Sequence, residues 1–226
     1  MQKEVEEPKE ALLDLEKLKK EQLKLAKQLI LKDKLPKEIN FIAGCDNSYF
    51  ENKVVSGIAV IDSKLEVVEE KFFLDRVHFP YVPEFLAYRE LPSMIQCYNK
   101  LETPIDLIFV DGNGILHPRG CGIASHFGLA INKPTIGIAK NLLLGEVKEG
   151  KVYVNGKIKG VELVTKEGSR PLYVSPDHMI SLDTAVKIVR DCLKPPHKLP
   201  EPLDVAHRYA ETVKQEFIKK SKPKIE

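Results

Sequence analysis

Two aspartates, Asp46 and Asp111, each directly follow an apolar segment of strand length, FIAGC and LIFV. Charged groups just past such strands lie at the edge of an open α/β sheet, where these sheets place their ligands. Two carboxylates on adjacent strands can share a divalent cation. Mg²⁺ takes one or two carboxylates, keeps several waters and completes its shell with phosphate oxygens of a substrate. The alternative is that each aspartate only caps a turn.

The loop after Asp111 has the sequence GNGILHPRG in residues 112–120. Its glycines permit backbone conformations closed to other residues and let a ligand approach the main chain closely. His117 and Arg119 add two basic groups, which we expect to lie within reach of an anion. An acid followed by glycines and basic groups favours a phosphate or base pocket over a simple turn.

Further polar residues are ambiguous when each is taken singly. Lys140 ends the apolar segment TIGIA and is either a surface charge or a phosphate clamp beside a metal. Glu90 and His207 are, by themselves, more typical of a salt bridge and a helix-face histidine. His126, within GIASHFGLA, fits a core histidine as well as a functional one.

Tyr81 lies between two prolines in the segment FPYVP. Both prolines restrict the chain, so an aromatic side chain held there is ordered in advance. Such a tyrosine can act as a wedge that stacks into a gap in a nucleic-acid strand. The alternative is a turn tyrosine packed on the domain.

The elements that must position these residues begin with a charged amphipathic helix at 9–32. Short apolar or alternating segments separated by polar turns then predict antiparallel strands at 40–45, 54–61 and 67–73. A helix follows near 85–100. Pro92 suits its first turn, which leaves Glu90 close to the helix start.

The second half of the chain alternates between strands and helices. A strand at 106–110, a helix at 122–131 and a strand at 134–139 predict parallel pairing in a sheet covered on both faces. Asn155-Gly156 predicts a tight hairpin turn between strands at 152–154 and 157–164. The remaining expected elements are a strand at 171–174, a helix at 182–193, a proline-rich crossing and a helix at 203–219. One α/β domain spanning 1–226 is predicted.

Composition limits the function classes. At 43% hydrophobic and 30% charged residues, the 226-residue chain is typical of a globular domain, and its apolar runs are too short for a membrane span. The charged start has no signal-peptide core, which predicts a cytoplasmic or nucleoid location. Four scattered cysteines without a CxxC pair argue against zinc and disulfides. A net charge of +2 leaves any nucleic-acid footprint local, near the site and in the basic tail at 220–226.

Taken together, these blocks resemble the endonuclease V family, from about residue 20 to residue 217. FPYVP followed by RE and then DGNG is a highly specific combination. The matching blocks are IAGCD (42–46), FPYVPEFLAYRE (79–90), VDGNGILHPR (110–119), GIASHFG (122–128), PTIGIAK (134–140), TKEGSRPLYVS (165–175) and Arg208 within PEPLDVAHRYA.

The resemblance implies a ribonuclease H-like mixed sheet flanked by helices, with a charged N-terminal helix in 1–35 packed on it. It also implies roles for single residues. Asp46 and Asp111 match the metal ligands, Glu90 and His207 match further members of the catalytic cluster, and Lys140 matches a phosphate-contacting lysine. Residues that match the wedge and the pocket for a flipped base are Tyr81, Leu86, Gly112, His117 and Ile123.

The implied activity is magnesium-dependent hydrolysis, with Mn²⁺ able to substitute, in repair of DNA that contains deaminated bases. The expected cut is at the second phosphodiester bond 3′ to inosine, leaving 3′-hydroxyl and 5′-phosphate ends, by a monomer without membrane contact. An inosine-specific endoribonuclease of the same fold is the alternative, since the distinguishing contact is to a 2′-hydroxyl. A non-catalytic nucleic-acid-binding protein and a purely structural α/β module are further alternatives. Glu84 departs from the family, which usually has a small residue at this wedge tip, and Cys45 is expected only to pack.

Overall fold

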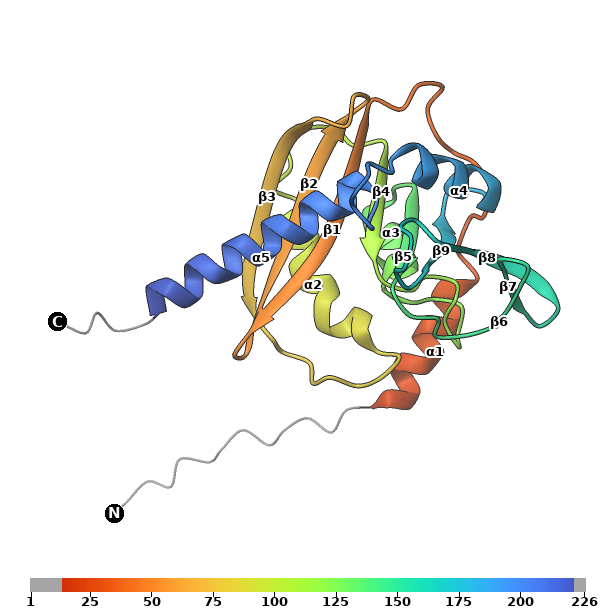
Figure 1. Ribbon diagram of the computed structural model, residues 1–226. Coiled ribbons are helices and arrows are strands. Elements are labelled where there is room, and N and C mark those ends of the chain that lie inside the picture. The colour runs from red at the N-terminus through yellow and green to blue at the C-terminus, as the bar shows by residue number, and fades with distance from the viewer. Residues whose placement is uncertain (1–13, 222–226) are drawn as a thin grey trace, which may run out of the picture.

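The computed structural model describes residues 14–221 as one nine-stranded mixed sheet with helices on both faces (Figure 1). The strand order is β3-β2-β1-β4-β5-β9-β8-β7-β6. The predicted α/β fold with a mixed, helix-flanked sheet is therefore confirmed. None of the helices among these residues is both long and apolar enough to cross a bilayer.

The first three strands form an antiparallel meander, as their short connections predicted. Their bounds are β1 Phe41–Phe50, β2 Lys53–Asp62 and β3 Val67–Arg76. Each strand is longer than expected. β1 pairs with β2 from Phe41↔Asp62 to Phe50↔Lys53, so the polar segment after Cys45 continues the strand. The expectation that Asp46 follows the strand end is therefore wrong, because pairing to β2 and not hydrophobicity holds residues 46–49 extended.

The centre of the sheet is parallel. β4 (Leu107–Asp111) pairs with β1 on one side and with β5 (Thr135–Ala139) on the other. Helix α3 (Ile123–Ile131) connects β4 to β5, as the strand–helix–strand pattern predicted. Side chains of β4 alternate between two cores, Ile108 and Val110 on one face and Leu107 and Phe109 on the other. A strand buried on both faces needs such a fully apolar sequence.

The other edge of the sheet is antiparallel. β9 (Leu172–His178) pairs with β5 and β8 (Lys157–Leu163), and β8 forms the expected hairpin with β7 (Lys151–Val154). The short strand β6 (Glu146–Lys148) was not predicted, because all three of its residues are exposed and carry no apolar pattern.

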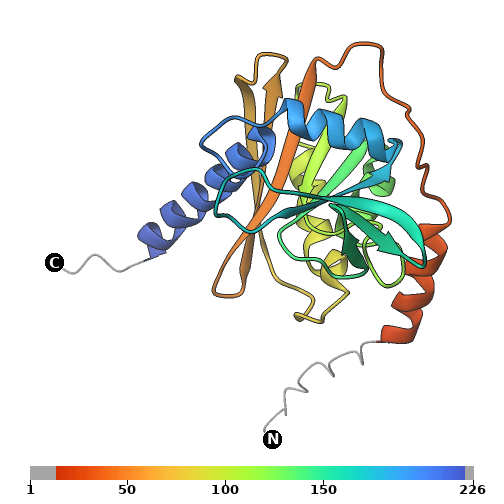
Figure 2. The same ribbon diagram turned by 45° about the vertical axis from the view of Figure 1, so that its right-hand side comes forward.

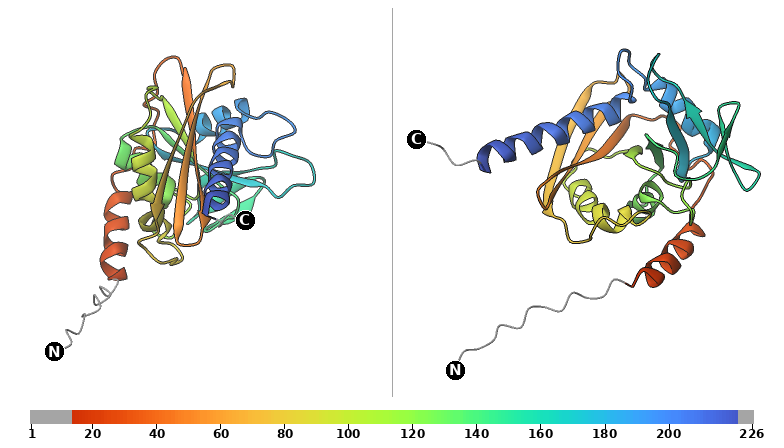
Figure 3. Two further views of the ribbon diagram at one scale, coloured as in Figure 1. Left: turned by 90° about the vertical axis from the view of Figure 1, so that its left-hand side faces the viewer. Right: turned by 60° about the horizontal axis from the view of Figure 1, so that its bottom comes forward.

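Helices form a layer on each face, as the views in Figures 2 and 3 show. α2 (Leu86–Tyr98) and α3 cover one face, and α4 (Leu182–Asp191) and α5 (Glu201–Ser221) cover the other. Helix α1 (Leu15–Ala26) contacts α3 at the margin of the first layer.

Helices α1 and α2 differ from prediction, and α5 begins two residues earlier than predicted, at Glu201. α1 ends at Ala26 rather than at residue 32, and the first residues of the predicted range lie outside the described part of the chain, as does most of the basic tail. Pro92 lies inside α2 and not in its first turn, because the helix already begins at Leu86. The proline lacks the N–H that would bond to the carbonyl one turn earlier, and the helix tolerates this loss.

Candidate active site

Asp46 and Asp111 lie side by side on the paired strands β1 and β4. The parallel register joins Cys45 to Val110, so each aspartate is the next residue along its strand. Asp46 is 8% exposed, and its Oδ1 accepts a hydrogen bond from the Asn47 N–H at 2.8 Å. Two neighbouring carboxylates with little solvent form a strongly negative point in the sheet.

Helix α5 brings His207 to this point. A Cβ on Gly44 would lie 2.0 Å from the Pro202 carbonyl oxygen, and one on Gly57 would lie 2.9 Å from the Ala210 side chain. The two glycines therefore let the helix pack closely on β1 and β2. His207 Nδ1 then lies 2.6 Å from Asp46 Oδ2, and this hydrogen bond raises the pKa of His207.

Lys140 follows β5 and forms an ion pair with Asp111. Burial and the neighbouring Asp46 carboxylate raise the pKa of Asp111 to about 6, although Lys140 acts in the opposite direction. Burial disfavours the Lys140 cation, but the Asp111 carboxylate outweighs it and the pKa of Lys140 is raised. The cluster thus holds excess negative charge that one lysine only partly offsets.

Glu90 enters the site from α2, where it is 6% exposed. Its carboxylate accepts hydrogen bonds from Tyr49 Oη at 2.5 Å and from Asn47 Nδ2 at 2.8 Å. Burial raises the pKa of Glu90 to about 7, and the charges of Asp46 and Asp111 act in the same direction. Asn47 in turn accepts from Ser56 Oγ. Sequence reasoning missed these partners, because polar residues inside a strand carry no local signal of function.

The donor set fits a magnesium ion. It consists of carboxylate oxygens close to a lysine and a histidine, and the nearby Cys45 thiol is fully buried. Hard cations such as Mg²⁺ prefer oxygen ligands, and a cation here would offset both the burial of the Asp111 carboxylate and its repulsion by Asp46, the two causes that raise the pKa of Asp111. Cys45 only packs, as expected, and the three other cysteines are also free and buried.

A second group of possible ligands, His197, Glu201 and Asp204, was not singled out from the sequence. His197 Nδ1 lies 3.0 Å from Glu201 Oε2, and Asp204 accepts from Arg208 Nε at 2.8 Å. These contacts already give the three side chains, which lie at or near the start of α5, their hydrogen-bond partners.

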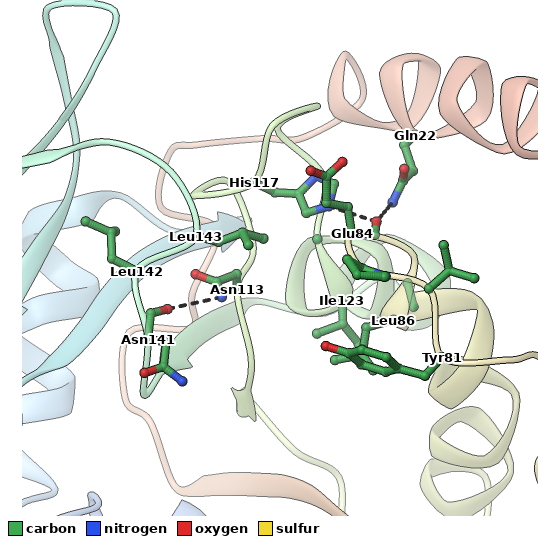
Figure 4. A pocket seen from close by; sticks show the side chains of 14 residues that line it. Gln22, Tyr81, Glu84, Leu86, Asn113, His117, Ile123, Asn141, Leu142 and Leu143 are labelled. Atoms are coloured by element: carbon green, nitrogen blue, oxygen red, sulfur yellow. Dashed lines mark hydrogen bonds between the residues drawn. The ribbon is translucent and has the colours of Figure 1, made fainter.

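A cavity of about 320 Å³ is lined in part by Asn113 and Asn141, which closely follow Asp111 and Lys140 in the chain. Four predicted residues line it, namely Tyr81, Leu86, His117 and Ile123, whereas Gly112 does not and its neighbour Asn113 takes that place. In Figure 4, Tyr81, Leu86 and Ile123 face a second wall made by residues 141–143. Tyr81 is 70% exposed, as a wedge requires. The second wall was missed because Leu142 and Leu143 resemble ordinary loop residues.

His117 and Arg119 differ from expectation, since neither presents a free charge to an anion. His117 is 4% exposed and bonds to the Glu84 carbonyl at 2.9 Å, and burial lowers its pKa. Arg119 pairs with the Glu84 carboxylate at 2.7 Å. His126 lies outside the site, packed edge-on against Tyr88.

Paired carboxylates on the central strands of this mixed sheet, with a lysine, a histidine and an adjoining pocket, define an α/β nuclease. The chain matches the model of the family described as Endonuclease V over residues 23–208. It is 37% identical to the endonuclease V of Thermosipho melanesiensis, with 92% of each chain covered. It is 40% identical to that of Dictyoglomus turgidum, covering 84% of this chain and 86% of the relative. The chain belongs to the endonuclease V family and is an endonuclease.

Solved structures of the family share the fold. The Bacillus subtilis endonuclease V is 31% identical, covers 92% of this chain and 95% of its own, and superposes with a TM-score of 0.85. The catalytic domain of human endonuclease V is 28% identical with a TM-score of 0.81, covering 94% of this chain and 98% of its own. The Ciona intestinalis protein, crystallised with DNA containing an inosine, is 24% identical, covers 90% and 98%, and has the same fold with a TM-score of 0.81.

Proposed function

We propose that this endonuclease requires magnesium and cuts nucleic acid next to deaminated adenine, at the second phosphodiester bond 3′ to the inosine. The observation that carries the proposal is the continuity between the acidic centre and the cavity. Asp111 and Lys140 are followed within three residues by Asn113 and Asn141, which line the cavity, and Asn113 Nδ2 donates to the Asn141 carbonyl at 3.4 Å. A base held in the cavity therefore places its own strand beside the carboxylates.

Asp46 and Asp111 would hold the metal. When bound, magnesium supplies Lewis-acid polarisation of the scissile phosphate and a more acidic water. Lys140, which pairs with Asp111, would offset negative charge on the phosphate in the transition state. His207 orients Asp46. Glu90, with a pKa of about 7, holds or releases a proton near neutral pH.

The cavity suits one unstacked base. Its walls carry the apolar residues Leu86 and Ile123 beside Asn113 and His117 from the loop at 112–120. Extrusion is easier where deamination has weakened pairing, and the exposed Tyr81 ring fills the gap by stacking. We further propose that the enzyme acts as a monomer in the cytoplasm, in repair of deaminated DNA, and that Mn²⁺ substitutes for magnesium.

The decisive experiment compares matched single-stranded DNA and RNA oligonucleotides that carry either inosine or adenosine at one position. With magnesium, we expect one cut per inosine strand and no cut in the adenosine controls, and the end groups are read by ligation. Asp111→Asn should abolish cutting. Equal cutting of inosine and adenosine strands would overturn the substrate assignment, and preferential cutting of the RNA would instead identify an inosine-specific ribonuclease.

A further inference from the structure

Glu84, at the tip of the wedge loop that follows Tyr81, has a left-handed backbone conformation with φ of 69°. A residue with a Cβ is strained there, and such a conformation persists only where surrounding contacts hold it. Its side chain is 38% exposed and the residue lines the cavity. The tip of the loop therefore combines backbone strain with a negative charge at the entrance for an anionic strand.

Three donors converge on the Glu84 carbonyl oxygen. They are Gln22 Nε2 at 3.1 Å, His117 Nε2 at 2.9 Å and Arg119 Nη2 at 3.1 Å. The His117 proton lies on Nε2, since Nδ1 accepts the Arg119 backbone N–H at 3.2 Å. Figure 4 shows the side chains of Gln22 and His117 both reaching this carbonyl oxygen. These contacts hold the strained residue in place.

The Glu84 carboxylate is paired rather than free. Arg119 Nη1 donates to its Oε2 at 2.7 Å, while Arg119 Nε donates to Gln22 Oε1 at 2.6 Å. The guanidinium also lies over the Phe85 ring, with Cζ 4.7 Å from the ring centroid. The Arg119 side chain is only 11% exposed. Its planar fork is thus fully engaged in one geometry, which lysine could not reproduce.

Gln22 connects this arrangement to helix α1. Among the residues of that helix, Gln22 alone is buried, with 0% exposure, and it also donates to the Cys121 carbonyl at 3.4 Å. A helix that presents a buried amide to a loop is docked by polar contacts, which lose their value if either partner is removed. The loop that carries Glu84, the segment at 119–121 and helix α1 therefore meet at the Gln22 side chain.

An unpaired carboxylate at this position would repel the phosphate backbone of an entering strand. We propose that Arg119 and Gln22 are positioning residues for substrate binding, which neutralise the Glu84 charge and hold the wedge tip so that the cavity accepts an anionic strand. The inference rests on the proposed function, because the strand is the substrate assigned above. Because Gln22 belongs to α1, the inference makes this helix part of the substrate-binding site.

The test measures kcat and KM on the single-stranded inosine DNA with magnesium, for wild type, Arg119→Met, Glu84→Gln, the Glu84→Gln/Arg119→Met double variant and Gln22→Leu. Methionine keeps the packing on Phe85 but removes the charge. We expect Arg119→Met to raise KM by about 10-fold or more with little change in kcat. Glu84→Gln should not raise KM, and the double variant should recover the part of the loss that the unpaired Glu84 charge causes, although not the part due to the lost contact between Arg119 and the Glu84 carbonyl. Gln22→Leu should raise KM in the same direction.

Arg190→Met provides the matched control, because Arg190 is exposed on α4 and its loss removes the same charge elsewhere. Thermal unfolding of each variant confines the comparison to folded protein. An unchanged KM in Arg119→Met, or a double variant no better than Arg119→Met, would overturn the inference while leaving the proposed function intact. Failure of the wild type to bind or cut inosine strands would overturn both.

Discussion

His207 Nδ1 lies 2.6 Å from Asp46 Oδ2 and joins the last helix to the first strand across 161 positions of sequence. Asp46 Oδ1 accepts from the Asn47 N–H, so both oxygens of this carboxylate have a fixed donor. A ligating group oriented in this way binds a metal with less loss of freedom than a mobile one. The contact depends on Gly44 and Gly57, which let α5 approach the sheet.

Replacement of His207 by alanine is expected to weaken metal use. Loss of a partner that orients a ligand typically costs about 10- to 100-fold in metal affinity or activity. The magnesium concentration for half-maximal cutting should rise by that order, and excess magnesium should restore part of the rate. Magnesium titrations of wild type and His207→Ala check this. A proportionate loss of rate at every magnesium concentration would instead indicate a role in proton transfer.

Magnesium and protons should compete at Asp111. The pKa of this carboxyl is raised to about 6, so it is ionised at neutral pH and becomes protonated as the pH falls through that value. A protonated carboxyl cannot bind the metal, and the half-maximal magnesium concentration should rise by up to about 10-fold per pH unit below the pKa. Magnesium titrations across this range measure the effect.

The variant Lys140→Met tests whether Asp111 is the group that takes up the competing proton. The lysine lowers the Asp111 pKa, so its removal should shift the onset of proton competition to higher pH. Glu90 titrates in a nearby range but pairs with Tyr49 and Asn47 rather than with Lys140. An unmoved onset in Lys140→Met would assign the competing proton to another group.

Much of the fold could be predicted because its central strands are continuously apolar. β4 and β5 are buried on both faces, and their sequences LIFV and TIGIA admit few other structures. The far end of β1 could not be predicted in the same way. Its residues Asp46 and Asn47 are polar and stay extended only through pairing with β2, which is a tertiary effect.

The site residues also fall into those that local sequence predicts and those that only tertiary contacts bring together. Asp111 and Lys140 could be found because each comes directly after a short apolar segment, LIFV and TIGIA, and Tyr81 because prolines flank it. Glu90 and His207 could be placed only by resemblance, since a buried acid inside a helix and a helix-face histidine carry no local signal. The Arg119–Glu84 pair spans 35 positions, and nothing in either segment alone specifies the partner.

Asp177 should make stability depend on pH. Its carboxyl is fully buried, Oδ1 accepts from the Ile115 N–H at 2.7 Å and from Ser125 Oγ at 3.1 Å, and Oδ2 has no hydrogen-bond partner among the described residues. Burial raises the pKa of Asp177 from 3.8 to about 7. Between these values the folded state holds a proton that the unfolded state has released. Its contribution to stability is present at low pH and is lost as the pH rises through about 7.

Relative to Asp177→Asn, wild type should lose at most about 1.4 kcal/mol of unfolding free energy per pH unit within this window. The asparagine keeps the side-chain shape and an acceptor oxygen but does not titrate. Urea unfolding of both proteins at intervals across the window gives the difference directly. Parallel pH profiles for the two proteins would show that Asp177 stays ionised in the folded state.

Tyr81 should contribute to substrate binding without contributing to stability. Its side chain is 70% exposed, so little packing is lost when the ring is removed. Stacking of a base on an aromatic ring is worth about 1–3 kcal/mol, and Tyr81→Ala should therefore weaken binding of inosine DNA by about 10-fold or more. Tyr81→Phe keeps the ring and should bind like wild type. Fluorescence anisotropy with a labelled strand in calcium buffer measures affinity without cutting. If phenylalanine were as weak as alanine, the hydroxyl and not the stacked ring would be the contact that matters.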